Sequence, residues 1–384
     1  MTQSSGSAEM TLRVAFDVTS LLEARTGVGA MAAALLDGLA RRPDLSLDAF
    51  AVSWRGRDRI GEVVPAGVAA HARPFPARLA RAAWSRSDVP TVRALAGRFD
   101  VVHGPNFVVP PGGGAAEVVT VHDLTAVRFP EMCTADVLQW PPLLRRAARR
   151  GAWVHAVSEH VGNEVRSAFP ELGDRVVAVP NGVDPPPMPT PASDAAAGRA
   201  LAGVDRFVLA LGTVDPRKDL PTLVAAFDQV AAHEPDLRLV IAGADGLAAS
   251  ELSAAIAASP HRDRVVRTGR IGTDERWALL RGASVVAYPS RYEGFGLVPL
   301  EAMSVGVPVV ATAVGAIPEV VGEAALLVAE RDAEALADAI HRVLTDEALA
   351  ASLVAAGSDR VARFSWDRSV EGVAALYRRA AAAR

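Results

Sequence analysis

Short apolar runs rich in β-branched residues alternate with longer segments of helical spacing along almost the whole chain. Residues 207–211 and 237–242 are two such runs, and residues 222–232 between them have a helical pattern. Short, nearly all-apolar strands are typical of parallel sheets that helices bury on both faces. The alternation therefore predicts an α/β fold with doubly wound sheets. Further strands are expected at 12–18, 47–52, 101–102, 118–121, 153–157 and 176–179, and at 264–267, 284–288, 307–311 and 325–328.

The chain is long enough for two domains, because domains usually run to about 100–200 residues and the sequence has 384. A proline-rich stretch, PPPMPTPASDAAAG, follows Asp184 and cannot continue a sheet or a helix. It predicts a linker over residues 184–200, between a domain at 11–183 and a second at 201–363. Residues 1–10 are expected to be a flexible N-terminus, and a terminal helix is expected within 364–384. Asp332 and Thr345 are candidate N-caps of two late helices.

Composition and charge exclude several classes of protein. A formal net charge of −4 is unlike the strongly basic surface of a nucleic-acid binder. The single cysteine, Cys133, cannot form an internal disulfide, which favours a cytoplasmic protein. The polar N-terminus lacks the features of a signal peptide, and no apolar run approaches the roughly 20 residues that span a bilayer. We expect a soluble protein, in contact with the inner face of the plasma membrane at most.

Lys218 is the only lysine among the basic residues, since arginine supplies all the others. It lies in the segment Gly212-Thr213-Val214-Asp215-Pro216-Arg217-Lys218-Asp219, just after a predicted strand. An arginine can engage a diphosphate with two hydrogen bonds, and a lysine can neutralise it as a point charge. The pair Arg217-Lys218 is therefore a candidate diphosphate site. A surface turn is the alternative interpretation.

The segment from Tyr288 to Met303 has a strand, a glycine-containing turn and a helix that begins near Leu297. The carboxyl ends of parallel strands are where α/β sheets bind ligands, and the free N–H groups of a helix start favour phosphate oxygens. Glu293 and Glu301 can accept hydrogen bonds from sugar and ribose hydroxyls. The alternative is a strand-to-helix turn with solvated glutamates.

Several features of the N-terminal half are weaker evidence of a ligand site when each is considered alone. Thr26-Gly27-Val28-Gly29 lies between a strand and a helix, where a tight turn explains the glycines equally well. His122 ends a predicted strand, and a hydrogen-bonded structural histidine is the commoner case. His103 is a lesser candidate for a ligand cleft, and Asp17 is interpreted as structural.

The segment from Tyr288 to Met303 resembles the E-x7-E signature of retaining GT-B glycosyltransferases of family four. Glu293 and Glu301 fit the two acidic positions, and Gly294-Phe295-Gly296, followed by Leu297, matches the loop that contacts donor sugar and phosphate. The strand after Gly306, together with Gly315 and Pro318-Glu319, also matches. The resemblance extends over nearly the whole chain, and it implies two Rossmann-like domains with the terminal helix returning to the first domain.

The resemblance also implies roles for individual residues. Arg217 and Lys218 hold the donor diphosphate, with Thr213 at a position where many members have arginine. Gly27 and Gly29 lie over the donor phosphates or the acceptor, and His122 faces the donor sugar. The region of Ile271 contacts the base, Glu293 positions the sugar and Glu301 the ribose. These residues imply a nucleotide-sugar site in the C-terminal domain and an acceptor site in the N-terminal domain.

The activity implied is transfer of a hexosyl group from a nucleotide-diphosphate sugar to a hydroxyl acceptor, with retention and without an enzyme nucleophile. The acceptor is a sugar, a lipid-linked sugar or a small metabolite. Guanine and uracil nucleotides both fit as donors, and GDP-mannose is slightly preferred among them. No Asp-x-Asp pair or zinc-type cluster occurs, so neither a metal nor another cofactor is expected. A sugar-nucleotide epimerase and a non-catalytic sugar-nucleotide binding module remain the alternatives.

Arginines are frequent in two parts of the N-terminal half. They could contact anionic lipids or a phosphorylated acceptor, but solvated helix faces are the favoured interpretation because nearby acidic residues balance them. The residues are Arg55, Arg57, Arg59, Arg73, Arg78, Arg81 and Arg86, and Arg145, Arg146, Arg149 and Arg150.

Overall fold

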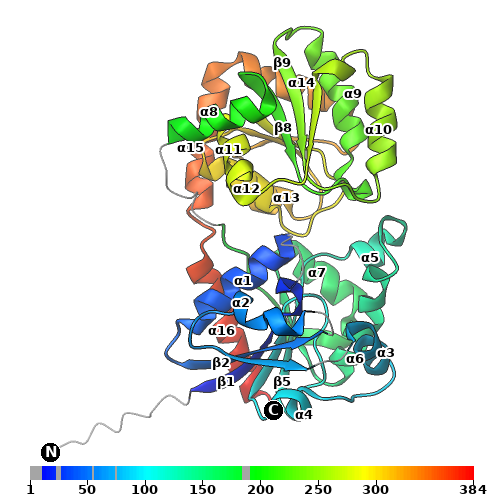
Figure 1. Ribbon diagram of the computed structural model, residues 1–384, viewed down its shortest axis with the longest axis vertical. Coiled ribbons are helices and arrows are strands. Elements are labelled where there is room, and N and C mark those ends of the chain that lie inside the picture. The colour runs from blue at the N-terminus through cyan, green and yellow to red at the C-terminus, as the bar shows by residue number, and fades with distance from the viewer. Residues whose placement is uncertain (1–10, 23–26, 54–55, 74–75, 184–190) are drawn as a thin grey trace, which may run out of the picture. The chain divides into compact units, whose positions relative to one another are not determined.

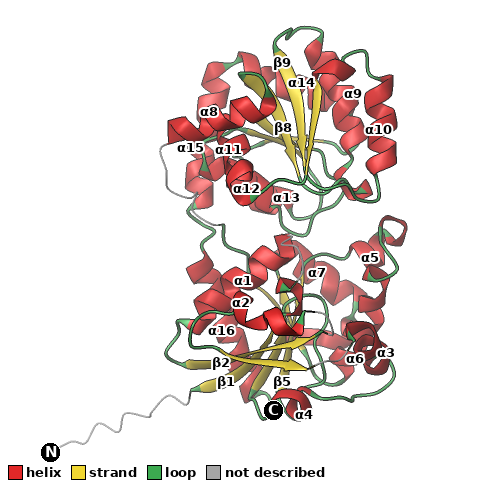
Figure 2. Cartoon of the chain, viewed as in Figure 1, coloured by secondary structure: helices red, strands yellow, loops and turns green. Residues whose placement is uncertain are grey.

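The computed structural model of the chain describes residues 11–22, 27–53, 56–73, 76–183 and 191–384 (Figure 1). The chain divides into two compact units: the first contains residues up to Gly182 together with Trp366–Arg384, and the second contains Val183–Ser365. In each unit the strands form one parallel sheet that helices cover on both faces (Figure 2). Residues 1–10 and 184–190, Thr26 and Arg55 lie outside the described part of the chain.

The first unit has a seven-stranded sheet in the order β3-β2-β1-β4-β5-β6-β7. The sequential order reverses between β1 and β4, which makes this point a topological switch. The strands are β1 (Leu12–Asp17), β2 (Leu45–Val52), β3 (Ala69–Arg73), β4 (Val101–Gly104), β5 (Ala116–Val121), β6 (Trp153–Ala156) and β7 (Val176–Ala178). The edge strand β3 has the sequence AAHAR, which lacks the β-branched run by which the other strands were predicted.

The helices of the first unit follow from amphipathic segments between the strands. In α1, the apolar residues Met31, Leu35, Leu36 and Leu39 recur at helical spacing, and all four are buried. Ser158 caps α7 by accepting a hydrogen bond from the Val161 N–H, as a helix start at Ser158-Glu159 requires. The helices are α1 (Gly27–Ala40), α2 (Ile60–Val63), α3 (Ala77–Trp84), α4 (Val92–Ala96), α5 (Thr125–Arg128), α6 (Trp140–Arg149) and α7 (Glu159–Ala168).

The C-terminal helix α16 (Trp366–Ala382) belongs to the first unit. Its residues Val373 and Tyr377 are fully buried in the core beneath the first sheet. The Tyr377 hydroxyl lies 2.6 Å from Nδ1 of His103 in β4. This packing confirms that the terminal helix returns to the first unit.

The second unit has a six-stranded sheet in the order β10-β9-β8-β11-β12-β13, with its switch point between β8 and β11. The strands are β8 (Arg206–Leu211), β9 (Leu237–Ala242), β10 (Val265–Gly269), β11 (Val285–Tyr288), β12 (Val309–Thr312) and β13 (Leu326–Val328). The helices are α8 (Pro191–Ala202), α9 (Leu220–Ala231), α10 (Ala249–Ala258), α11 (Thr273–Gly282), α12 (Leu297–Ser304), α13 (Ile317–Val321), α14 (Ala333–Thr345) and α15 (Glu347–Val361).

Two local expectations differ from the structure. Residues 191–200, assigned to the linker from their proline content, are helical in α8, because a proline is tolerated in the first turn of a helix. Asp332 caps α14 as predicted, but Thr345 is the last residue of that helix rather than the cap of the next. Asp346 caps α15 by accepting from the Leu349 N–H. Among the described helices, none combines the length and the apolar character needed to cross a membrane.

Candidate functional site

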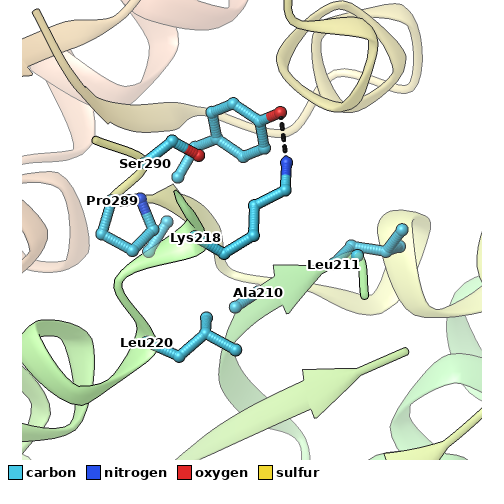
Figure 3. A pocket seen from close by; sticks show the side chains of 9 residues that line it. Ala210, Leu211, Lys218, Leu220, Pro289 and Ser290 are labelled. Atoms are coloured by element: carbon cyan, nitrogen blue, oxygen red, sulfur yellow. Dashed lines mark hydrogen bonds between the residues drawn. The ribbon is translucent and has the colours of Figure 1, made fainter. Parts of the chain in front are cut away.

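The switch point of the second sheet brings two predicted segments together. β8 and β11 are adjacent and parallel, with Val285 opposite Val208. The loop after β8 and the loop after β11 therefore leave the same edge of the sheet, where ligands of α/β folds bind. A small pocket lies between these loops (Figure 3). It is lined by Ala210, Leu211, Gly212, Lys218, Leu220, Ala287, Tyr288, Pro289 and Ser290.

Lys218 ends a short 3-10 turn, Pro216–Lys218, and its side chain is only 13% exposed. The next residue, Asp219, has a left-handed φ of 45°, which ends the turn before α9 begins at Leu220. The Lys218 ammonium donates to Oε1 of Glu293 and to the hydroxyl of Tyr288, each at 2.7 Å. Burial lowers the pKa of Lys218, and the Glu293 carboxylate opposes that effect.

Glu293 is buried between two cations. Its Oε2 forms an ion pair with Arg217, and its Oε1 pairs with Lys218 and accepts a 2.7 Å hydrogen bond from Ser290 Oγ. Burial would raise the pKa of Glu293, but Arg217 and then Lys218 outweigh it and hold the pKa at about 2. The carboxylate is ionised at neutral pH, so two positive charges surround one negative charge. The cluster has an excess of positive charge, which suits an anionic ligand.

The loop after β11 is shaped by glycines that permit close backbone contacts. Gly296 has a left-handed φ of 114° and precedes α12, whose first N–H groups point out of the helix start. A Cβ at Gly315 would lie 2.2 Å from the Glu293 carbonyl oxygen, so only glycine fits there. The Ala316 N–H donates to that same oxygen at 2.9 Å. This contact fixes the backbone that carries Glu293, which explains why the sequence has glycine at 315.

Glu301 lies on α12 and is 9% exposed. Its carboxylate forms an ion pair with Arg276 of α11. Arg276 could not be predicted as a partner of Glu301, because only the packing of α11 beside α12 brings the two residues together. The other predicted residues of this unit are at the same edge: Thr213 is exposed in the loop after β8, and Ile271 is half-buried between β10 and α11.

The predicted residues of the first unit lie directly after the C-terminal end of β5 and at the start of α1. His122 donates from Nε2 to the Pro105 carbonyl at 2.8 Å. Burial lowers the pKa of His122, opposed by that hydrogen bond, so the imidazole is neutral with Nδ1 as an acceptor. Gly27 and Gly29 are the first and third residues of α1, the former exposed and the latter buried.

Two other residues of the first unit have structural roles. Asp17 accepts from the backbone N–H and the hydroxyl of Thr19, consistent with the structural role expected of it. Its burial raises its pKa to about 6. His103, a lesser cleft candidate, is fully buried and bonded to Tyr377 and Thr120. His103 is therefore a core residue, because both ring nitrogens are already used within the sheet and α16.

Two arginines at the C-terminal end of α6 are paired with acidic residues, one in its last turn and one directly after it. Arg146 and Arg150 both pair with Asp88, and Arg150 also pairs with the buried Glu117. This pairing supports the interpretation that these arginines belong to an ordinary solvated helix face. Within the described ranges, no group of three His, Cys, Asp or Glu side chains is placed to hold a metal ion.

Comparison with known proteins finds a matching family model for each unit. The family model for glycosyltransferase family 4 matches residues 25–186, and that for glycosyl transferases group 1 matches residues 196–360. O-antigen chain mannosyltransferase B of Escherichia coli is 29% identical over 277 residues, covering 70% of this chain and 71% of that protein. D-inositol 3-phosphate glycosyltransferase of Acidothermus cellulolyticus is 32% identical over 313 residues, covering 75% and 69%.

Solved structures share the whole fold. Sucrose-phosphate synthase from Thermosynechococcus elongatus aligns with a TM-score of 0.75 at 24% identity, covering 97% of this chain and 100% of that one. Anabaena HepE in complex with UDP and glucose aligns with a TM-score of 0.69 at 19% identity, covering 95% and 98%.

Proposed function

The chain belongs to the glycosyl transferases of group 1, and we propose that it moves a hexosyl group from a nucleotide-diphosphate sugar to a hydroxyl acceptor, with retention of the anomeric configuration. The observation that carries this proposal is the cluster of Arg217, Lys218 and Glu293 at the carboxyl edge of the second sheet. Its two cations exceed its one carboxylate, and the start of α12 lies in the same loop region. Both features favour a diphosphate.

The cations and the glutamates have different parts in the proposed reaction. Arg217, Lys218 and the start of α12 stabilise the negative charge that develops on the departing diphosphate, usually the largest electrostatic contribution in such chemistry. Glu293, which stays ionised, accepts hydrogen bonds from sugar hydroxyls. Glu301 likewise accepts hydrogen bonds from the ribose hydroxyls.

The remaining predicted residues complete the donor site. Thr213 and the loop Gly294–Leu297 approach the phosphates and the sugar, and Ile271 approaches the base. In the first unit, we assign Gly27 and Gly29 to the donor phosphates or the acceptor and His122 to the donor sugar, and we propose that this unit binds the acceptor. The neutral His122 can accept through Nδ1 from a sugar hydroxyl.

We propose that the reaction needs neither a divalent metal nor another cofactor. A diphosphate requires positive charge during bond cleavage, and Arg217 with Lys218 supplies two fixed charges where a metal-dependent enzyme would hold Mg²⁺. The charges are preorganised, since burial and the contact with Glu293 hold both side chains in place.

The transferred sugar is proposed to be mannose, which the mannosyltransferase among the relatives supports. The acceptor is a sugar, a lipid-linked sugar or a small metabolite, in keeping with relatives that act on an O-antigen chain or on inositol 3-phosphate. We place the reaction in glycan, glycolipid or cell-envelope biosynthesis, in the cytoplasm or at the inner face of the plasma membrane.

A thermal-shift screen against GDP, UDP, ADP and dTDP, with and without EDTA, tests the donor site. A ligand at a hundred times its Kd stabilises the folded state by about 2.7 kcal/mol. For units of this size, we expect one nucleotide to raise Tm by about 5 °C or more. EDTA should leave that shift unchanged. A shift that EDTA abolishes would contradict metal independence, and the absence of any shift would contradict the nucleotide site.

A further inference from the structure

Tyr288 ends β11 at the switch point, and its ring lies beside the Lys218 ammonium. The hydroxyl accepts a 2.7 Å hydrogen bond from Nζ, which lies 4.3 Å from the centroid of the ring. The tyrosine is 4% exposed, so its hydroxyl has little access to solvent. A buried hydroxyl needs partners: Lys218 donates to it, and it also has side-chain hydrogen bonds with Glu293 and Ser290.

The two acceptors of the ammonium differ in charge. Glu293 is an ionised carboxylate, whereas burial and the nearby Glu293 raise the pKa of Tyr288 well above its usual value. Tyr288 therefore remains a neutral phenol. A neutral acceptor fixes the position of a cation without cancelling its charge, and that charge is what a diphosphate requires.

A lysine needs such an anchor more than an arginine does. Its four-carbon stem is flexible, and its ammonium is a point charge without the preorganised fork of a guanidinium. A Cβ at Gly212 would lie 3.4 Å from Cε of Lys218, so the end of the stem crosses this glycine. Gly212 locates the stem, and Tyr288 locates the ammonium.

Tyr288 is itself held firmly. It is paired with Ala311 of β12 in the centre of the sheet, and the adjacency of β8 and β11 sets its distance from the Lys218 loop. The side chain is almost fully buried, so the packed ring has little room to follow a mobile lysine. The tyrosine is therefore the rigid member of the pair.

We propose that Tyr288 is a positioning residue of the diphosphate site: its hydroxyl holds the Lys218 ammonium toward the diphosphate while Glu293 engages the sugar. This inference rests on the proposed function, because it requires Lys218 to bind the donor diphosphate. It assigns a role to Tyr288, the first residue of the segment that carries Glu293 and Glu301.

The test is calorimetric titration of the full chain with GDP, UDP, ADP and dTDP, using the nucleotide that binds the wild-type protein most tightly. A hydrogen bond to a charged group accounts for about a tenfold change in affinity. Tyr288→Phe keeps the ring and removes the hydroxyl, so we expect Kd to rise about tenfold. Lys218→Ala should raise Kd at least as much.

A double variant separates action through Lys218 from an independent effect. If Tyr288 acts by positioning the ammonium, Tyr288→Phe in the Lys218→Ala background should change Kd by less than about twofold. A wild-type Kd in Tyr288→Phe, or a full tenfold loss in both backgrounds, would overturn the inference while leaving the donor site intact. An unchanged Kd in Lys218→Ala, or no binding of any of the four nucleotides, would overturn the proposed function and the inference with it.

Tyr377→Phe is the matched control. Tyr377 is a buried tyrosine with a hydrogen-bonded hydroxyl, but it lies on α16 in the first unit. Loss of the Tyr377 hydroxyl removes the hydrogen bond to His103, so Tm should fall, but the nucleotide Kd should stay unchanged. A tenfold loss of affinity in this variant would show that removal of any buried tyrosine hydroxyl perturbs binding, and would overturn the assignment of Tyr288.

Discussion

In Lys218→Ala, sugar transfer is expected to fall by about a hundred- to a thousandfold while the protein stays folded. Lys218 pairs with Glu293 at 2.7 Å, and in the proposed reaction it meets the charge that develops on the leaving diphosphate. The substitution leaves Glu293 paired with Arg217, so the carboxylate keeps a cationic partner. The measurement is kcat, from the nucleoside diphosphate released at saturating donor, together with Tm.

Arg206→Ala is the control for Lys218→Ala. Arg206 begins β8 in the same unit and pairs with Glu234 at 2.9 Å, at the opposite edge of the sheet from the site. The control should retain full activity, since it removes a paired cation without touching the pocket. Wild-type kcat in a folded Lys218→Ala protein would exclude the role assigned to Lys218.

The second large effect is expected for Glu293→Gln, which should lower transfer by about a hundredfold without weakening nucleoside diphosphate binding. The amide has the shape of the carboxylate but lacks its charge, and it accepts hydrogen bonds from sugar hydroxyls less strongly. Removing the charge also leaves Arg217 and Lys218 without their shared carboxylate. Tm should therefore fall, and the diphosphate should restore it more fully than in the wild-type protein.

Glu234→Gln is the matched control for the glutamate variant. Glu234 is similarly enclosed, with a side chain 13% exposed, and it pairs with Arg206 rather than with the site cations. The comparison needs kcat and the Kd for the nucleoside diphosphate in both variants. Equal losses of binding and transfer in Glu293→Gln would mean that Glu293 does not act specifically on the sugar.

Much of the fold could be predicted because most buried strands are marked in the sequence by a short apolar run rich in β-branched residues. Of the thirteen strands in the described part of the chain, twelve were expected within a few residues, and the alanine-rich edge strand β3 was missed. The parallel sheets and the solved relatives confirm the GT-B architecture that the resemblance implied. The ends of helices were predicted less accurately, because a proline can begin a helix as well as prevent one. The helix α8, for example, begins at Pro191.

The sequence predicted the separate segments of the site but not which of their side chains are in contact. Arg217 and Lys218 precede Glu293 by more than seventy residues, and only the adjacency of β8 and β11 brings them into contact. Strand order is set by the packing of the whole sheet, which no local pattern reports. The partners Tyr288 and Arg276 were missed for that reason, since each becomes part of the site only through its neighbour.

The most direct test of the central claim is mass analysis of reactions of the full chain with GDP-mannose or UDP-glucose in EDTA. The acceptor panel should include mannose-terminated oligosaccharides, a lipid-linked sugar and inositol phosphate. We expect acceptor-dependent release of nucleoside diphosphate, matched by an acceptor that gains one hexosyl group, and loss of both products in Lys218→Ala. An isomerised sugar released without acceptor, or binding of the donor without turnover, would contradict a glycosyltransferase and favour an epimerase or a binding module.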